Sequence, residues 1–423
     1  MLSQSKSWAA QILPETPRLS KDNQPLEQVR ENTIMIRFLT SGESHGKGLI
    51  SVIEGFPAHV PIDVAFVNSE LKRRMGGYGR GARMKIESDE IDIFAGVRHG
   101  YSLGSPIAFA ISNRDWVNWL DIMSVEPNPE GAGKRKVDRP RPGHADLVGA
   151  MKYQFSDMRN VLERSSARET TSRVAVGAFC KLLLQSLGIR IYSHVVAIKD
   201  VRISAAQLEK VSIDLVPQIE ASSLRCCDSS LEEEMKKAVD DAIENGDTIG
   251  GTFEVRALGV PPGLGSHVHW DRKLDGLLVQ ALMSINAIKA VENGFGLDPA
   301  PTGSEFHDEI FYDQQKRRFY RETNHAGGLE GGTSNGEEII IRAVVKPIAT
   351  LKRPLRSVNL ATKEPFKAQY ERSDTCVVPA AGVIGEAMVA IVLTRAVQEK
   401  FGGDTLQEVQ ANLESYLQTV HQM

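Results

Sequence analysis

The segment from residue 375 to residue 394 contains only one charged side chain, Glu386, in twenty positions. A stretch this apolar has to lie either inside a folded core or inside a membrane. Pro379, Gly382 and Gly385 interrupt it, so we expect the end of a buried strand followed by a core helix over residues 384–400. Small residues in that helix permit close contact with neighbouring elements.

Strand-like and helix-like segments alternate through the rest of the chain. The first convincing strand covers residues 34–39, and Asp63 can cap a helix that ends near Gly76. Further helices are expected at about 146–159, about 170–187 and 231–244, the last capped by Ser229 or Ser230, and further strands at 251–260 and 337–346. No repeat, heptad run or proline-rich linker divides these segments. We therefore expect an α+β fold with a single large domain over residues 34–423, preceded by an N-terminal extension or disordered tail at residues 1–33.

The cysteine pattern favours a reducing compartment. Cys180, Cys226, Cys227 and Cys376 show no CxxC spacing, and the adjacent pair has poor geometry for a structural disulfide. The N-terminus lacks the apolar region of a secretory signal and makes a weak transit peptide. We expect a cytoplasmic protein, or a plastid one in a plant or alga.

Positive charge is concentrated between residues 134 and 173. This segment has ten Lys or Arg against five Asp or Glu, whereas the whole chain has a net charge of −4. Arginine presents a planar set of donors that matches carboxylate and phosphate oxygens. With a titratable histidine, His144, in the same segment, the pattern predicts a pocket for a small polyanion.

Two histidines lie in short loops of glycine, proline and small residues. His45 occurs in GESHGKG and His144 in RPRPGHAD, so each imidazole can approach a ligand closely and act as a general acid. Asp374 follows Arg372 by two residues, a cation that should keep this candidate base ionised. Ser165 and Ser166 can either cap a helix or, with the arginines on both sides of them, bind a phosphate or carboxylate.

Other candidate motifs are weaker. Gly46-Lys47 lacks the first glycine of a phosphate-binding P-loop, and the loop from Gly77 to Gly81 has no strand before it, which argues against dinucleotide binding. That loop still presents Arg80 and Arg83 near Arg74, so it can bind an anion. His267 and His269 have no further ligand nearby, and we expect no metal site.

Seven segments occur in a specific order: GESHG, RPGHAD, RSSARET, MSINAIKAVENG, NHAGGLEGGTSNG, KPIATL and RSDTCVVPAAGVIGEAM. Together they resemble the chorismate synthase family over residues 34–401. The resemblance implies a β-α-β sandwich that assembles as a homotetramer. It also implies a phosphate-eliminating carbon–oxygen lyase of the shikimate pathway of aromatic amino acid biosynthesis. Such an enzyme converts 5-enolpyruvylshikimate 3-phosphate into chorismate by an anti-1,4-elimination that needs reduced FMN but has no net redox change.

The same resemblance assigns roles to individual residues. His45 resembles the acid that meets the departing phosphate, His144 the residue that protonates or supports the reduced flavin, and Asp374 the residue that helps to remove the C6 proton. Arg74 and Arg80 match positions that bind the substrate or NADPH. The positions that match FMN contacts are Arg164, Ser165, Ser166, Asn286, Ala287, Gly331, Lys346, Pro347, Ile348, Ala349, Thr350 and Arg372. Ala349 departs from the proline or serine of many relatives, at a backbone contact.

Two other functions are consistent with parts of the pattern. One is a flavin oxidoreductase that consumes NADPH and acts on a small polyanion. The other is a nucleic-acid-binding module, which is disfavoured by a pI of about 6.2 and by aromatic residues that fall inside a predicted helix. We expect no nucleic-acid or membrane partner. No separate NADPH-binding domain is visible, which favours reduced FMN supplied by another protein, a flavin reductase.

Overall fold

The computed structural model describes residues 35–81, 88–131, 133–295, 301–371 and 373–423. The expected N-terminal extension at residues 1–33, as well as Arg83 and Arg372, lie outside the described residues. Residues 35–423 belong to one compact unit.

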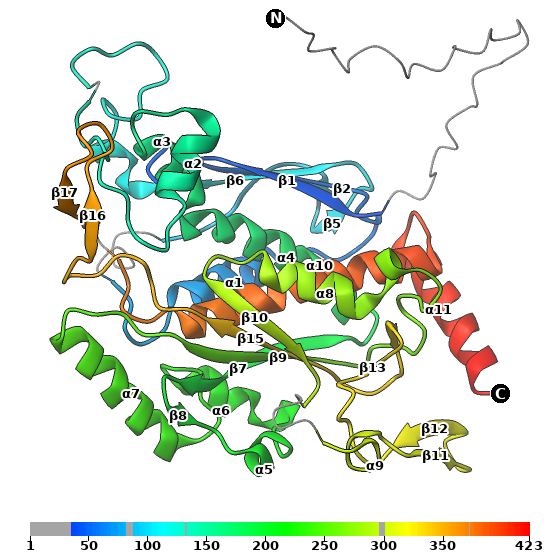
Figure 1. The fold of residues 1–423 in the computed structure, drawn as a ribbon. Coiled ribbons are helices and arrows are strands. Elements are labelled where there is room, and N and C mark those ends of the chain that lie inside the picture. Colours follow the sequence, from blue (N-terminus) through cyan, green and yellow to red (C-terminus); the bar gives the residue numbers. More distant parts are fainter. Residues whose placement is uncertain (1–34, 82–87, 132, 296–300, 372) are drawn as a thin grey trace, which may run out of the picture. The chain divides into compact units, whose positions relative to one another are not determined.

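Two antiparallel sheets enclose a layer of helices (Figure 1). The first sheet has the strand order β1 (Arg37–Ser41), β2 (Gly48–Glu54), β6 (Ile107–Ser112) and β3 (Asp92–Ala95). The second has the order β10 (Ile288–Asn293), β15 (Ile339–Val345), β9 (Gly251–Leu258), β7 (Arg190–Ile198) and β8 (Val201–Arg202). The helices α1 (Val64–Met75), α4 (Thr170–Gln185), α8 (Leu274–Met283) and α10 (Val378–Phe401) lie between them. The α+β sandwich expected from the sequence is thereby confirmed.

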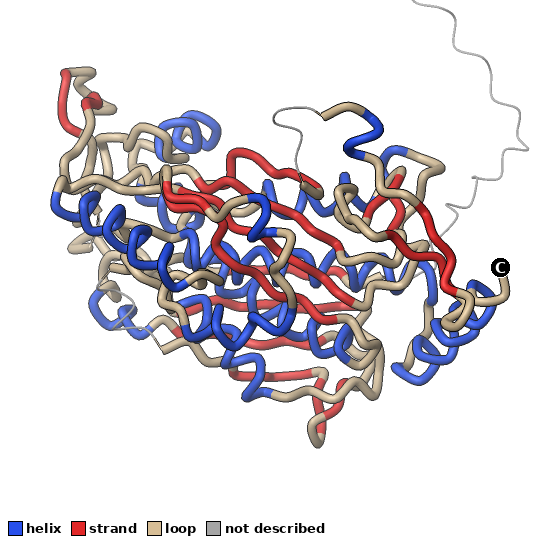
Figure 2. The backbone as a smooth tube through the Cα atoms, turned by 90° about the horizontal axis from the view of Figure 1, so that it is seen from below, coloured by secondary structure: helices blue, strands red, loops and turns tan. Residues whose placement is uncertain are grey.

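The remaining elements connect or flank these layers. They are β4 (Val97–Arg98), β5 (Tyr101–Ser102), η2 (Arg114–Asn118), α2 (Asp146–Tyr153), α3 (Arg159–Ser165), η3 (Ala167–Glu169), α5 (Ala205–Leu208), η4 (Ile213–Leu215), α6 (Val216–Ala221), α7 (Ser229–Glu244), η5 (Trp270–Arg272), α9 (Gly303–Phe306), β11 (Ile310–Asp313), β12 (Arg318–Arg321), β13 (Leu329–Glu330), β14 (Thr333–Ser334), β16 (Arg356–Val358), β17 (Pro365–Lys367) and α11 (Leu406–Val420). In the view from below, strands cross the middle of the unit between the helices (Figure 2).

Helix α10 is the apolar segment that the sequence singled out. It is long and apolar enough to cross a membrane, but 94% of its most apolar stretch is buried inside the protein. It packs against α4 on one side and against β7 and β9 on another. The expected strand end before it is wrong: the described residues around Cys376 are not in a strand, and the helix begins at Val378 with Pro379 in its first turn.

Two other expectations also need correction. The single helix predicted over 146–159 is two helices, because Gln154 adopts the left-handed conformation (φ 57°) and ends α2. Helix α7 is capped by Asp228, whose carboxylate accepts from the backbone N–H groups of Ser230 and Leu231. Asp63, by contrast, caps α1 as predicted, accepting from Phe66 N.

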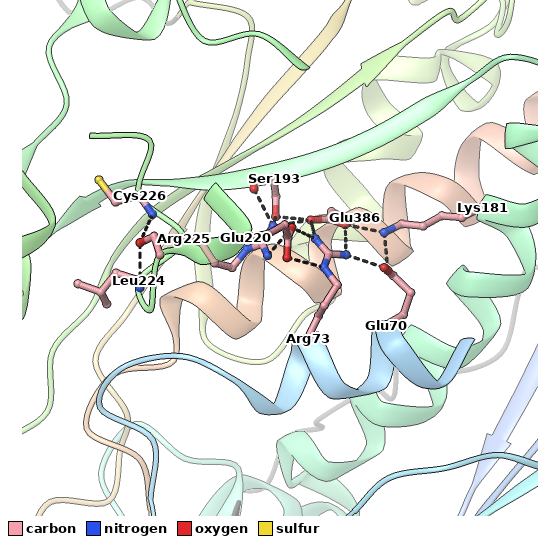
Figure 3. Close-up of polar contacts among 10 residues, drawn as sticks. Glu70, Arg73, Lys181, Ser193, Glu220, Leu224, Arg225, Cys226 and Glu386 are labelled. Atoms are coloured by element: carbon pink, nitrogen blue, oxygen red, sulfur yellow. Dashed lines mark hydrogen bonds and ion pairs between the residues drawn. The ribbon is translucent and has the colours of Figure 1, made fainter. Parts of the chain in front are cut away.

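A buried ionic cluster ties α1, α4, α10 and β7 together (Figure 3). Its centre is the Glu386 carboxylate of α10, whose side chain is 0% exposed. Arg73 of α1 binds it through two nitrogens, at 2.8 and 2.9 Å. The other members are Glu70, Lys181, Ser193, Glu220 and Arg225. The cations outweigh the effect of burial, so the pKa of Glu386 is lowered and the carboxylate stays ionised.

Candidate active site

A cavity of about 1680 Å³ opens where the C-terminal end of α1, the α3–η3 junction and the first turns of α10 meet. Among the described residues that line it, eight are Lys or Arg and three are Asp or Glu. The predicted site residues that line it are His45, Arg74, Arg80, His144, Ser165, Ser166, Asn286, Ala287, Lys346, Pro347, Ile348, Ala349, Thr350 and Asp374. Residues from distant parts of the sequence therefore share one cationic cavity.

His45 is held by a carboxylate that the sequence analysis missed. Its Nδ1 lies 2.9 Å from Oε1 of Glu163, and its backbone N–H donates to Oε2 of Glu163 at 2.7 Å. Its ring stacks on Trp119, with 3.8 Å between the ring centroids. Burial acts to raise the pKa of Glu163, but the hydrogen bonds and charge of His45 lower it overall, so Glu163 is ionised.

His144 has an equivalent partner two residues along the chain. Its Nδ1 lies 2.6 Å from Oδ1 of Asp146, which is fully buried at the start of α2. Arg141 donates to the same carboxylate from Nε at 2.8 Å and to Thr350 Oγ1 at 2.9 Å. This network links the His144 loop to the segment from Lys346 to Thr350.

Asp374 is far from α1 along the sequence, but its side chain lies against the loop that follows this helix. Its Oδ1 accepts from the backbone N–H of Gly81 at 2.6 Å, and its Oδ2 lies 3.1 Å from Nη1 of Arg80. From the sequence, Arg372 was expected to be the cation next to Asp374, but Arg372 lies outside the described residues. The structure brings Arg80 to this carboxylate.

Arg74 is a buried cation that faces the cavity. It donates from Nε to Thr170 Oγ1 at 3.1 Å and from Nη2 to Ala167 O at 2.7 Å. Its Nη1 has no hydrogen-bond partner within the described part of the protein. Burial and the charges of Arg80 and Arg168 lower the pKa of Arg74 to about 9. An anion beside Nη1 would satisfy both the donor and the charge.

Known proteins of similar sequence and structure were found along almost the whole chain. A family model described as chorismate synthase matches residues 36–398. A chorismate synthase of Solibacter usitatus is 55% identical over 91% of this chain and 99% of its own length, and one of Desulforamulus reducens is 54% identical over 92% of this chain and 100% of its own. A crystal structure of a chorismate synthase, 41% identical, aligns over 92% of this chain and 99% of its own with a TM-score of 0.73.

The chain belongs to the chorismate synthase family. It is therefore a lyase, as the resemblance implied.

Two predicted site residues of this chorismate synthase family member, Arg164 and Gly331, do not line the large cavity. Arg164 lies with Asn286 in a neighbouring cavity of about 470 Å³ and donates to the backbone oxygens of Thr40 and Gly42. Gly331 lies between β13 and β14, away from the lining. Arg372 lies outside the described residues.

Ser165 and Ser166 both line the large cavity of this chorismate synthase family member, and Ser166 also caps a helix. Ser166 caps η3 by accepting from Arg168 N, as expected for a cap. Arg168 is itself bound to Asp89 at 2.6 Å and to Asn113 at 2.8 Å. The charge of Arg168 is therefore partly balanced by protein groups, which its sequence position did not reveal.

Two carboxylates that bind the histidines were not predicted from the sequence, and they differ in whether the sequence carried a signal for them. Asp146 lies two residues after His144 in the GHAD segment, so its proximity could have been proposed. Glu163 is 118 residues from His45 and carries no local signal. Among the described residues, no group of three or more His, Cys, Asp or Glu side chains could hold a metal.

Proposed function

We propose that the large cavity catalyses the anti-1,4-elimination of phosphate from 5-enolpyruvylshikimate 3-phosphate, which gives chorismate, with reduced FMN as a cofactor and without net redox change. The observation that carries this proposal is the excess of cations around two carboxylate-bound histidines. A substrate with two carboxylates and a phosphate needs such a cavity. The reaction would serve the shikimate pathway of aromatic amino acid biosynthesis.

Arg74 and Arg80 are the proposed substrate cations. The vacant donor of Arg74 and its lowered pKa both favour an anion at this position. Arg80 is already oriented by Asp374, so a substrate held by Arg80 has a carboxylate within reach. Binding by fixed guanidinium groups would hold the substrate in one orientation for the elimination. These arginines are also the positions at which NADPH could bind as a reductant.

The lining fits a flavin with a phosphate tail. Asn286 has a buried Oδ1 with no hydrogen-bond partner among the described residues, and Ala287 has a strained φ of 70°. The residues proposed to hold FMN are Ser165, Ser166, Asn286, Ala287 and the segment of Lys346, Pro347, Ile348, Ala349 and Thr350, with Arg164, Gly331 and Arg372. Reduced FMN, when bound, supplies electron density that stabilises charge as the C–O bond breaks.

The acid and base roles follow from position. His45 would give a proton to the departing phosphate, because its ring reaches the cavity while Nδ1 is bound to Glu163. His144 would support the reduced flavin with a ring fixed by Asp146. Asp374 would assist in removing the C6 proton of the substrate, since Arg80 and Gly81 N hold its carboxylate at the cavity.

The assembly is proposed to be a homotetramer in the cytoplasm. The outer face of the first sheet supports association, since Leu39, Ile50 and Phe94 on it are 78%, 57% and 70% exposed. The named relatives are bacterial, which supports a cytoplasmic location. Reduced FMN is proposed to come from a separate flavin reductase. Anaerobic protein that turned over with NADPH and FMN alone would show intrinsic reductase activity instead.

An anaerobic assay with dithionite-reduced FMN tests the proposal. Phosphate and chorismate should appear in equal amounts over many turnovers while the absorbance of reduced FMN stays constant. Consumption of one reductant per product would contradict the elimination and favour the alternative, an NADPH-consuming flavin oxidoreductase. A reaction without flavin, run in parallel, should give no product.

A further inference from the structure

The carboxylate of Glu163 contacts His45 at two points. Oε2 accepts the backbone N–H of His45 at 2.7 Å and also lies 3.1 Å from ring Nδ1, while Oε1 lies 2.9 Å from Nδ1. The Glu163 side chain is only 1% exposed, and Nη1 of Arg159, on the preceding turn of α3, lies 3.4 Å from Oε1 of Glu163. A buried, ionised carboxylate can only accept hydrogen bonds. Nδ1 of His45 therefore carries a proton in this arrangement.

One face of the imidazole ring of His45 is covered as well. Trp119 stacks on the ring with an interplanar angle of 21°. The indole is itself held, since its Nε1 donates to Asp115 at 3.0 Å and the guanidinium of Arg135 lies 4.1 Å from its ring centroid. With one edge bound and one face covered, the His45 ring has little freedom to rotate. Its remaining nitrogen, Nε2, is the one available to the cavity.

We propose that Glu163 is a positioning residue for the reaction, which holds the Nδ1 proton of His45 so that Nε2 alone delivers a proton to the departing group. This inference rests on the proposed function for the role of the delivered proton. The Nε2 proton passes to a phosphate oxygen, and the ring is left neutral with its other proton still on Nδ1. The charged groups that face the ring or its stacking partner are Glu163, Arg159, Arg135 and Asp115.

Substitution by glutamine reverses the hydrogen bonding at almost the same volume. The amide oxygen of Glu163→Gln would still accept the backbone N–H of His45, which leaves its NH₂ group at the position of Oε1, the nearer of the two atoms to Nδ1. Nδ1 must then accept, so the neutral ring carries its proton on Nε2. Protonation of both nitrogens would place two donors against each other. The doubly protonated form needed by an acid is thereby disfavoured.

The first test measures the ring nitrogens directly. Protein with ¹⁵N-labelled histidine, assigned with a His45→Asn variant, is examined at a pH where the imidazole is neutral. The wild type should show the proton on Nδ1 of His45, and Glu163→Gln should show it on Nε2. A wild-type ring with its proton on Nε2 would overturn the proposal, even if the variant did not fold.

The second test is kinetic. Glu163→Gln should lower kcat by about 10² with reduced FMN present, while KM for the enolpyruvyl substrate changes less than about threefold. A kcat within about twofold of wild type would overturn the positioning role. Asp271→Asn is the matched control, because Asp271 makes the same kind of carboxylate–Nδ1 contact, at 2.6 Å, with His269 on the exposed surface. It should keep wild-type kinetics. Because the ring measurement needs no turnover, failure of the proposed reaction would leave that result intact.

Discussion

His144 Nδ1 and Asp146 Oδ1 are 2.6 Å apart, and the carboxylate of Asp146 is fully buried. Arg141 completes the arrangement by donating to the same carboxylate from Nε and Nη2, at 2.8 and 2.9 Å. Burial acts to raise the pKa of Asp146, but the hydrogen bonds from His144 and Arg141 outweigh it and lower that pKa well below its ordinary range. The site thus pairs an ionised carboxylate with each of its two histidines.

The Asp146 contact has a consequence for stability against pH. Because the pKa of Asp146 is lower in the folded than in the unfolded protein, ionised Asp146 stabilises the folded state above its ordinary pKa of 3.8. That stabilisation is lost as the pH falls below this value. Asp146→Asn should therefore unfold at a lower urea concentration than wild type near neutral pH. The difference in unfolding free energy between the two proteins should shrink below about pH 4. A difference independent of pH would contradict this account.

Arg74 should matter for binding through its planar guanidinium. The guanidinium of Arg74 directs separate nitrogens to Thr170, to Ala167 and to the proposed anion, whereas lysine has a single nitrogen at its tip, so Arg74→Lys should raise KM for the substrate by roughly tenfold or more. Steady-state kinetics with reduced FMN measures this. Lys72 is an exposed cation on the same turn of α1, and Lys72→Ala should leave KM unchanged. Equal effects of the two substitutions would indicate a general charge effect instead.

Glu386 should be essential to the fold. Glu386→Gln leaves Arg73, Lys181 and Arg225 without their shared buried carboxylate (Figure 3). We expect a loss of about 3–5 kcal/mol in the free energy of unfolding, measured by urea denaturation. The exposed pair of Arg37 and Glu54 provides the comparison, and Glu54→Gln should cost less than about 1 kcal/mol. A cost of that size for Glu386→Gln would contradict the structure.

Two glycines in the helical layer should respond in opposite directions to alanine. A Cβ on Gly177 of α4 would lie 2.3 Å from Cβ of Ala387 of α10, so Gly177→Ala should force these helices apart and lower the melting temperature. A Cβ on Gly276 of α8 meets nothing within 4 Å. Gly276→Ala should therefore stabilise the protein by about 0.5–1 kcal/mol through helix propensity. Differential scanning calorimetry of both variants checks the close approach of α4 and α10.

The elements best predicted from the sequence were those with local signals. Asp63 supplies the side-chain cap of α1 as predicted, and the apolar run around Glu386 is a buried helix as expected, although its first part was expected to be the end of a strand. The break at Gln154 has no comparable signal, because no glycine or proline marks the left-handed residue. The cap of α7 was misplaced by one or two residues, since Asp228 and the serines after it are all good capping residues.

The residues that line the site were predicted better than the contacts that these residues make. The cationic cavity follows from residue types, most of its lining was implied by the resemblance to the chorismate synthase family, and His45, His144 and Asp374 do share it. The partners of those residues do not follow from order. Glu163 meets His45, Arg80 meets Asp374 and Asp89 meets Arg168 only through the packing of segments far apart in the chain.

The account depends on this cavity being the active site, and turnover of His144→Ala and Asp374→Ala tests that most directly. Each variant should lower kcat with reduced FMN by more than roughly tenfold while still binding FMN, because each removes a proposed reacting group, whereas the serines and the segment from Lys346 to Thr350 that are proposed to hold FMN remain. FMN binding is followed by fluorescence quenching in the same samples. Near wild-type turnover in either variant would contradict the role given to that residue, and near wild-type turnover in both would place the chemistry elsewhere.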